Sequence, residues 1–232
     1  MKAIWLSFFQ MAAAMRKDKM LLAACLTPVL AGLFFRFAIP SLEVVLTSYF
    51  GMPALLSPYY GLLDLFFMML SPAMFCFASA MTSLEEADER TAVYLFITPL
   101  GKTGYLSARL GIPAVTAFLV TITLLPVFNL TPLTPVAALL FTAAGTLQGL
   151  ITALIVLALS SNRLEGMAIT KLSTLTAFGA AVPFFTRHSI QYALFLLPSF
   201  WTGKAAHENT LLYLLPAFLL SITWLTLLLK QY

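Results

Sequence analysis

The sequence VAALLFTAAGTLQGLITALIVLAL, residues 136–159, runs without a single charged side chain. A helix crosses the hydrocarbon core of a bilayer with about 20 predominantly apolar residues. The run is long enough for one crossing, and small residues such as Ala144 and Gly145 let a neighbouring helix approach closely. This stretch therefore predicts a transmembrane helix.

Five further apolar segments lie on either side of this one. They cover residues 20–38, 60–81, 105–128, 167–185 and 210–229. Only 9% of the 232 residues are charged, whereas a soluble domain carries about 25%. So few charges cannot coat a soluble protein of this size, but in a bilayer lipid replaces water around most of the surface. We predict one all-α integral membrane domain over residues 1–232, with six spans and no soluble catalytic domain.

The N-terminal residues 1–17 predict a helix that lies in the membrane interface. Bulky apolar residues recur there at three- and four-residue steps, which is the spacing of one helical face. The helix is too short to span, and a basic cluster follows it that can meet anionic headgroups. The expected interfacial anchors are Trp5, Phe8, Arg16, Lys17 and Lys19.

The connections between the spans differ in character. Pro40 is expected to stop the first span, so that residues 41–58 form an outer loop. Residues 84–103 carry four carboxylates and must lie in water, which predicts a cytoplasmic loop. The segment 187–207 is irregular and rich in aromatic residues.

Lys and Arg are distributed unevenly between the two ends of the predicted bundle. If the N-terminus is cytoplasmic, ten of them lie on the cytoplasmic side and three on the outer side. Because basic residues concentrate in cytoplasmic loops, both termini are expected in the cytoplasm. The expected location is the cell membrane as a multi-pass protein, and a bacterial cytoplasmic membrane in particular.

Two charged side chains fall inside predicted spans, near their outer ends. Arg36 lies in the first span and Asp64 in the second. An ionisable residue costs about 2.5 to 3.5 kcal/mol deep in a span, so each needs a partner or a role. We expect either a structural ion pair between them or a place on the substrate path.

Signatures of catalysis and of cofactor binding are missing from the sequence. It contains no HExxH, no GxSxG, no phosphate-binding loop and no cluster of metal-ligating residues. Cys25 and Cys76 lie in apolar segments without a disulfide or zinc spacing, and no long basic run suggests nucleic acid. We expect no catalytic residue, no metal, no cofactor bound by this chain and no nucleic-acid partner.

The polar segment after the second span reads EEADERTAVYLFITPL, residues 85–100. Its first half holds four carboxylates, and its second half is apolar up to Pro99, where a helix is expected to stop. This pattern predicts a cytoplasmic helix with an acidic start, which the helix dipole favours, and with an apolar surface that needs cover. A solvated helix packed on its own bundle is the alternative interpretation.

This segment resembles the cytoplasmic loop after span two in type 2 ATP-binding-cassette (ABC) transporter permeases. The interfacial helix, the turn SNRLEG at residues 161–166 and the segment LPSFW at residues 197–201 resemble the same family. In that family the loop is seated on a cytosolic ATPase subunit, the first helix forms an elbow, and two six-span permeases form a dimer. The coupling contact would fall on Glu85, Glu86, Glu89, Arg90, Thr91, Thr98 and Pro99, with Tyr94 and Phe96 packed beneath.

The resemblance implies the permease subunit of an exporter rather than an enzyme. Because the sequence has no Gly-x-x-x-x-Gly-Lys-Ser/Thr motif, ATP and magnesium would be bound by a separate ATPase subunit. The second permease chain would be an identical copy, giving a homodimer, or a related chain, giving a heterodimer. The few polar groups inside the spans favour an amphipathic or hydrophobic substrate, such as a drug, a peptide or a lipid-like molecule.

Two other classes of protein fit the sequence. A non-transporting membrane scaffold or immunity protein could share six spans and basic inner loops. A membrane-embedded lipid-modifying enzyme would need polar groups at one depth, for which only Asp64 and His188 are available. If the permease interpretation is right, reversing Glu86 and Glu89 to lysine is expected to uncouple ATP hydrolysis from transport.

Overall fold

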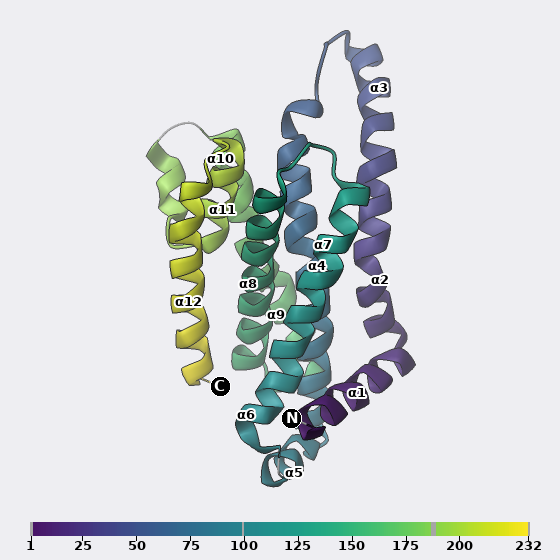
Figure 1. Ribbon diagram of the computed structural model, residues 1–232, viewed down its shortest axis with the longest axis vertical. Helices are drawn as coiled ribbons and strands as arrows, with labels where there is room; N and C mark the ends of the chain where they lie inside the picture. The colour runs from purple at the N-terminus through teal and green to yellow at the C-terminus, as the bar shows by residue number, and fades with distance from the viewer. Residues whose placement is uncertain (1, 99, 187–188, 232) are drawn as a thin grey trace.

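The computed structural model describes residues 2–98, 100–186 and 189–231 and shows a bundle of long helices (Figure 1). Six helical stretches in this described part are long and apolar enough to cross a membrane. They are Lys19–Phe50, Ser57–Asp88, Gly101–Phe128, Pro135–Leu159, Arg163–Phe185 and Leu211–Gln231. The predicted architecture, an all-α membrane protein with an N-terminal helix and six spans, is confirmed.

Most spans are assembled from more than one helical element. Span one joins α2 (Lys19–Leu33), the π-helical η1 (Phe34–Ala38) and α3 (Ile39–Phe50), and span two joins η2 (Ser57–Tyr59) and α4 (Tyr60–Asp88). Span three joins α6 (Gly101–Leu106), the π-helical η3 (Ser107–Gly111) and α7 (Ile112–Phe128), and span four is α8 (Pro135–Leu159). Span five joins α9 (Arg163–Ser173), the 3₁₀-helical η4 (Thr174–Ala181) and α10 (Val182–Phe185), and span six joins η6 (Leu211–Tyr213) and α12 (Leu214–Gln231). The remaining helices are α1 (Lys2–Lys17), α5 (Thr91–Ile97), η5 (Ser189–Leu194) and α11 (Pro198–His207).

The two ends of the bundle carry different elements (Figure 1). At the lower end, α1 runs obliquely from below α2 toward α6, and α5 forms the lowest turn of the molecule. At the upper end, α3 rises above the other helices, and α10 and α11 lie beside the upper part of α12. Both termini lie in the lower half, as an even number of spans requires.

The centre of the bundle is the contact between α4 and α8. Gly145 and Gly149 face the backbone of α4, where a Cβ added to Gly145 would lie 2.2 Å from the Met68 carbonyl oxygen. A Cβ added to Gly149 would lie 3.1 Å from the backbone nitrogen of Ala73. Small residues thus let the two helix backbones touch, as the sequence of span four predicts.

We expect Gly145→Ala to loosen this contact. The new methyl group meets a backbone carbonyl rather than a flexible side chain, so the helices must separate, at a cost of about 1–3 kcal/mol of unfolding free energy. Gly61→Ala is the matched control, because Gly61 lies in α4, the other helix of this pair, and nothing comes within 4 Å of its added Cβ. Thermal unfolding in detergent measures both. Equal unfolding temperatures for the two variants would contradict the close contact.

Span one continues past Pro40, which corrects the predicted end at residue 38 and the outer loop 41–58. The π-helical segment Phe34–Ala38 precedes the proline, and its longer hydrogen-bonded turn lets the helix absorb a residue without an N–H group. The helix ends at Gly51, whose φ of 64° is the left-handed conformation common at helix ends. Only residues 51–56 form the connection, and Glu43 accepts hydrogen bonds from the backbone of Leu55 and Leu56 there, at 3.0 and 2.6 Å.

Span two also runs further than predicted, to Asp88 instead of residue 81. Thr82 and Ser83 do not break the helix, because each hydroxyl donates to the carbonyl four residues earlier, at 3.0 Å. Both side chains are buried within the bundle. The carboxylates that follow therefore end α4 instead of starting a new helix, so the favourable dipole interaction expected for an acidic start does not arise.

The connection between spans five and six, at the upper end of the bundle, folds around Lys204 of α11 (Figure 1). Its Nζ donates to the Tyr192 hydroxyl at 2.5 Å and lies 4.8 Å from the centre of the Tyr213 ring. Burial lowers the pKa of Lys204, but the hydrogen bond to Tyr192 and the nearby Glu208 carboxylate outweigh this effect and raise it. The charged side chain thereby holds η5, α11 and the start of span six together.

Candidate functional site

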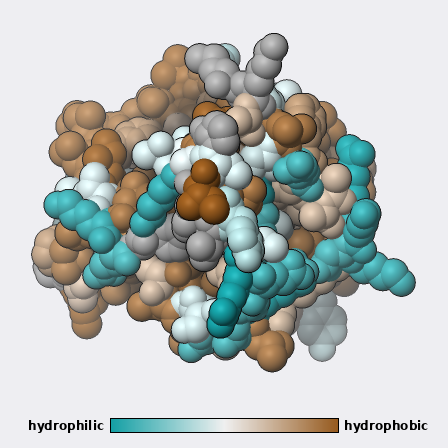
Figure 2. Space-filling view, turned by 90° about the horizontal axis from the view of Figure 1, so that it is seen from below, coloured by the Kyte–Doolittle hydropathy of each residue, from teal (hydrophilic) through white to brown (hydrophobic). Residues whose placement is uncertain are grey.

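The candidate functional site is the polar lower end of the bundle, where α4, α5 and α6 meet α1. Viewed from below, hydrophilic side chains gather on this face around apolar groups (Figure 2). Glu85 and Glu86 lie in the last turn of α4, and Glu89 caps it. The chain then reverses at Arg90, whose φ is 57°, and Thr91 begins α5. Pro99 lies outside the described residues.

Glu86 is held inside the protein by Arg109 of span three. The guanidinium binds both carboxylate oxygens, with Nε to Oε2 at 2.9 Å and Nη2 to Oε1 at 2.5 Å. The Tyr105 hydroxyl donates to the same carboxylate at 2.9 Å, and Arg109 Nη1 donates to the Ser7 carbonyl of α1 at 2.9 Å. The Arg109 side chain is only 3% exposed. One bidentate ion pair therefore joins the end of span two to span three and to α1.

Arg163 makes a second connection at the start of span five. Its side chain forms salt bridges with Asp18 and, at 3.2 Å, with Glu85. Its backbone N–H donates to Asp88 at 3.1 Å, so Glu85 and Asp88 of α4 both contact Arg163 of α9. Asp18 also caps α2, accepting from the backbone of Met20 at 2.8 Å. Spans one, two and five are thus tied together through Arg163.

The Asp18 carboxylate gives this connection a pH dependence. The hydrogen bond from Arg163 and those from the backbone of Leu21 and Met20 outweigh partial burial, so that the pKa of Asp18 lies below its usual value of 3.8. A lowered folded-state pKa stabilises the fold above the unfolded value, and this contribution is lost as the pH falls through the folded value.

We therefore expect acid to weaken the protein partly through Asp18. Asp18→Asn keeps the helix cap but removes the charge, so it should unfold at a lower temperature than the wild type at about pH 6. Below about pH 4 the difference between the two proteins should shrink. Thermal unfolding followed by tryptophan fluorescence between about pH 6 and about pH 3 measures this. A constant difference over the whole range would contradict the assignment.

The outward side of α5 and its flanking turns form an exposed surface. We call Glu89, Arg90, Tyr94, Ile97 and Thr98 the α5 surface, since all five side chains are exposed. Tyr94 is 68% and Ile97 81% exposed. The predicted place of Tyr94 beneath the coupling contact is wrong, because the side chain points away from the bundle; the side chain of Phe96 is outside the described set.

The inward side of α5 packs on a small apolar cluster. Ala92 and Leu95 contact Leu100 and Tyr105 of the following segment and Ile4 of α1. Thr91 adds a hydrogen bond from its hydroxyl to the Glu86 carbonyl at 3.1 Å. The structure thus separates the residues expected at the coupling contact into two groups. Glu89, Arg90 and Thr98 are exposed, whereas Glu85, Glu86 and Thr91 make contacts within the chain.

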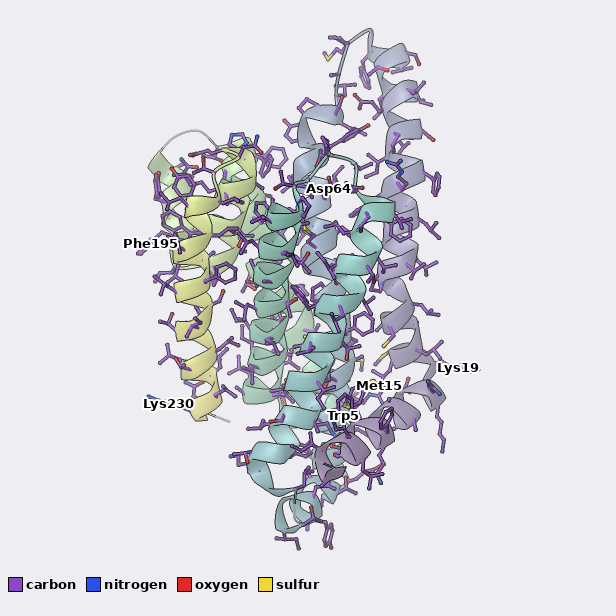
Figure 3. All side chains as sticks on the ribbon, in the orientation of Figure 1. Trp5, Met15, Lys19, Asp64, Phe195 and Lys230 are labelled. Atoms are coloured by element: carbon purple, nitrogen blue, oxygen red, sulfur yellow. The ribbon has the colours of Figure 1, made fainter. Side chains whose placement is uncertain are left out.

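The predicted interfacial anchors lie on and beside α1 (Figure 3). Trp5 is 52% exposed and packs edge-on against Phe8, with 6.2 Å between the ring centres. Arg16, Lys17 and Lys19 are exposed where α1 meets span one. The opposite side of α1 is buried against the bundle through Ser7 and Met11. Contact of the exposed side with lipid headgroups stays a prediction.

Asp64 and Arg36 meet at the same turn but do not form a salt bridge with each other among the described residues. The Asp64 carboxylate accepts from the backbone of Leu130 and Thr131 at 2.7 and 2.8 Å, and Arg36 donates to the Asn129 carbonyl at 3.1 Å. In place of the expected ion pair, each side chain forms its own hydrogen bonds to the turn between spans three and four. Asp64 also lines a cavity of about 480 Å³ in the upper part of the bundle, and its place on a substrate path stays a prediction (Figure 3).

Arg109 and Arg163 are the residues whose roles the sequence analysis missed. Arg109 lies one turn inside an apolar span, the same signal that singled out Arg36 and Asp64. His188 is outside the described residues, and among the described ones no group of three or more His, Cys, Asp or Glu side chains could hold a metal.

Comparison with known families agrees with this architecture. The family model described as Rv2686c-like, fluoroquinolones export permease protein Rv2686c-like, matches residues 11–229. Comparisons with curated proteins and with solved structures gave no match. The family match extends over nearly the whole chain and bears out the resemblance to type 2 ABC permeases. The chain belongs to the Rv2686c-like family of fluoroquinolones export permease proteins.

Proposed function

We propose that this chain is the membrane-spanning subunit of an ATP-driven exporter and that its α5 surface docks on a separate cytosolic ATPase subunit. The export-permease family supports the permease role. The observation that carries the ATPase contact is the exposure of Tyr94 and Ile97 among charged residues at a polar end of the molecule. Large apolar side chains with a polar rim on a water-facing surface are typical of protein interfaces.

The lower end would face the cytoplasm. The exposed basic residues Arg16, Lys17, Lys19 and Arg90 belong to this end, and basic residues favour the cytoplasmic side. Lys19 and Lys230 lie at similar heights at the ends of spans one and six, where lysine side chains reach the headgroup region (Figure 3). Both termini would then be cytoplasmic. In a bacterium the membrane would be the cytoplasmic membrane.

ATP and magnesium would be bound by the ATPase subunit. The movement that this subunit imposes on α5 would reach the spans through Arg109 and Arg163. A displacement of α5 acts on the end of α4, to which it is joined at Arg90. Arg109 connects that end to span three, and Arg163 connects it to spans one and five. Hydrogen-bonded ion pairs are short and directional, so they transmit a rigid displacement better than apolar contacts alone. A second permease chain, identical or related, would complete the transport path.

The proposed substrate is amphipathic or hydrophobic. The family name refers to fluoroquinolones, which are flat aromatic drugs of this class. The large apolar surfaces of the spans and the cavities between them suit such a molecule better than a highly charged solute.

Purification of the tagged chain in mild detergent tests the proposal. We expect a cytosolic chain with a Gly-x-x-x-x-Gly-Lys-Ser/Thr motif to co-purify, to be identified by mass spectrometry, and to hydrolyse ATP. Reconstituted vesicles containing both chains should then transport a fluoroquinolone only when ATP is present. Recovery of a folded chain without any ATPase, from cells in which neighbouring genes are expressed, would contradict it.

A further inference from the structure

A cavity of about 270 Å³ lies between spans one, two, four and five. Three phenylalanines from different spans line it, namely Phe35 of η1, Phe66 of α4 and Phe178 of η4. Phe66 and Phe178 pack edge-on, with 5.9 Å between the ring centres. The walls of the cavity are therefore aromatic on several sides, a surface suited to a flat ring.

Gln148 is the polar residue that stands out in this cavity. It lies near the middle of α8 and is only 3% exposed. Its Nε2 donates to the Thr176 hydroxyl at 2.8 Å, but its buried Oε1 has no hydrogen-bond partner among the described residues. Buried amide oxygens almost always have a partner, and a polar side chain at membrane depth commonly marks a substrate path.

Methionines complete the lining on the side of α4. Met69 is buried and Met74 is partly buried, and both side chains face the cavity. Methionine is flexible and polarizable, so it adapts to ligands of different outline and packs well on aromatic rings. This combination favours a site that accepts a group of related molecules rather than one.

The cavity continues along the seam between α4 and α8. A second, much smaller space shares the lining residues Ala73, Met74, Thr152 and Thr174 and extends to Val156 and Thr170. It holds only about 10 Å³ in this conformation, so the connection is closed. On the other side Phe178 is 59% exposed, which leaves access past span five.

We propose that this cavity is the substrate site of the exporter and that it takes a flat aromatic molecule. The Gln148 Oε1, which is covered in this conformation, would accept from an N–H or O–H group of that molecule once the amide turns toward the cavity. The three phenylalanines contact the ring faces and edges, and the amide fixes the orientation. The proposal rests on the export function proposed above and assigns it a site. Binding itself needs no ATP, so the two can be tested separately.

Norfloxacin is a suitable probe, because it is flat, aromatic, fluorescent and carries an N–H group. Its equilibrium binding is measured on the full-length chain in lipid nanodiscs, with the ATPase present where it co-purifies. Gln148→Leu removes the acceptor without adding a polar group to the bilayer, and we expect about tenfold weaker binding. Phe178→Ala should weaken binding by a similar factor through loss of ring contact.

Leu175→Ala is the matched control. Leu175 lies in the same 3₁₀-helical segment, is 59% exposed and does not line the cavity, so binding should change less than about twofold. Size-exclusion chromatography checks the fold of each variant. Phe66→Ala provides a second test of the aromatic wall if Phe178→Ala aggregates.

The outcomes separate the site from the export function. Binding that weakens with Gln148→Leu and Phe178→Ala but not with Leu175→Ala supports the site, even if no ATPase is found and the export proposal fails. The site is overturned if both variants bind norfloxacin as tightly as the wild type, or if the wild type does not bind it. In either case an active ATPase complex leaves the export proposal intact. Native mass spectrometry shows whether a phospholipid occupies the cavity. The proposed site is also overturned if norfloxacin does not displace such a phospholipid and Phe178→Ala releases it.

Discussion

A Tyr94→Asp/Ile97→Asp double variant is expected to lose the ATPase subunit and ATP-dependent export while its membrane domain stays folded. Both side chains are largely exposed, so their replacement removes no core contact. A hot-spot residue contributes about 2 kcal/mol or more to an interface, and two charges would replace the apolar centre of this one. The affinity for the ATPase should therefore fall at least about hundredfold. Co-purification and transport in reconstituted vesicles measure the two effects.

The matched control for this variant is Leu164→Asp. Leu164 is 77% exposed and follows Arg163, but it lies outside the α5 surface. We expect the control to retain the ATPase and most of the transport. Loss of the ATPase from both variants would place the interface elsewhere on the lower face. Retention by the double variant would remove the α5 surface from the account.

Arg109→Leu is expected to cause the largest loss of stability in the chain. The substitution leaves the Glu86 carboxylate partly buried and removes its bidentate partner, while the hydrogen bond from the Tyr105 hydroxyl stays. Removing one member of a buried ion pair costs about 3–5 kcal/mol, because the other charge is left without compensation. The same change frees the Ser7 carbonyl of α1. Unfolding in mixed micelles followed by tryptophan fluorescence measures the loss.

A neutral variant of Glu86 and a double-mutant cycle separate the contribution of the ion pair from that of side-chain packing. Glu86→Gln keeps an oxygen that can accept from Arg109, so it should cost less than Arg109→Leu. In a double-mutant cycle the coupling energy of Arg109 and Glu86 should be at least about 1 kcal/mol. Additive effects, or an Arg109→Leu variant as stable as the wild type, would contradict the ion pair as the connection between spans two and three.

The ion pair changes the meaning of a charge-reversal experiment designed from the sequence. Reversing Glu86 to lysine would place two cations together inside the protein, so a loss of transport would report damage to the fold rather than a lost docking contact. Glu89 is exposed and can be reversed without this effect. Uncoupling by Glu89→Lys alone therefore remains a valid test of docking.

The number of spans could be predicted from the sequence because it depends only on the lengths of apolar runs. The ends of spans one and two could not be predicted, since each depends on a local compensation. At Pro40 a π-helical segment carries the helix past the proline, and at Thr82 a hydroxyl bonds within its own helix. Proline and polar residues usually end a transmembrane helix, but at these two positions the local hydrogen bonding lets the helix continue.

The candidate site could be located from the sequence but not assembled. The segment 85–100 identifies itself by its charges and its apolar half. Glu86 looks equivalent to Glu89 there, and only the fold brings Arg109 to one and leaves the other exposed. Gln148 likewise could not be singled out from the sequence. Its unpaired oxygen and the cavity that it lines become visible only when side chains from four spans are placed.

The most direct measurement of the central claim is site-specific photo-crosslinking from the α5 surface. A photoreactive amino acid is placed at Ile97 in one sample and at Leu212 in another. Leu212 is a similarly exposed residue, at 68%, but lies at the start of span six. We expect irradiation of intact cells to link Ile97, and not Leu212, to a cytosolic chain whose mass-spectrometric sequence contains the ATP-binding motif. Crosslinks from Ile97 only to lipid or to copies of this chain would contradict docking of the ATPase on α5.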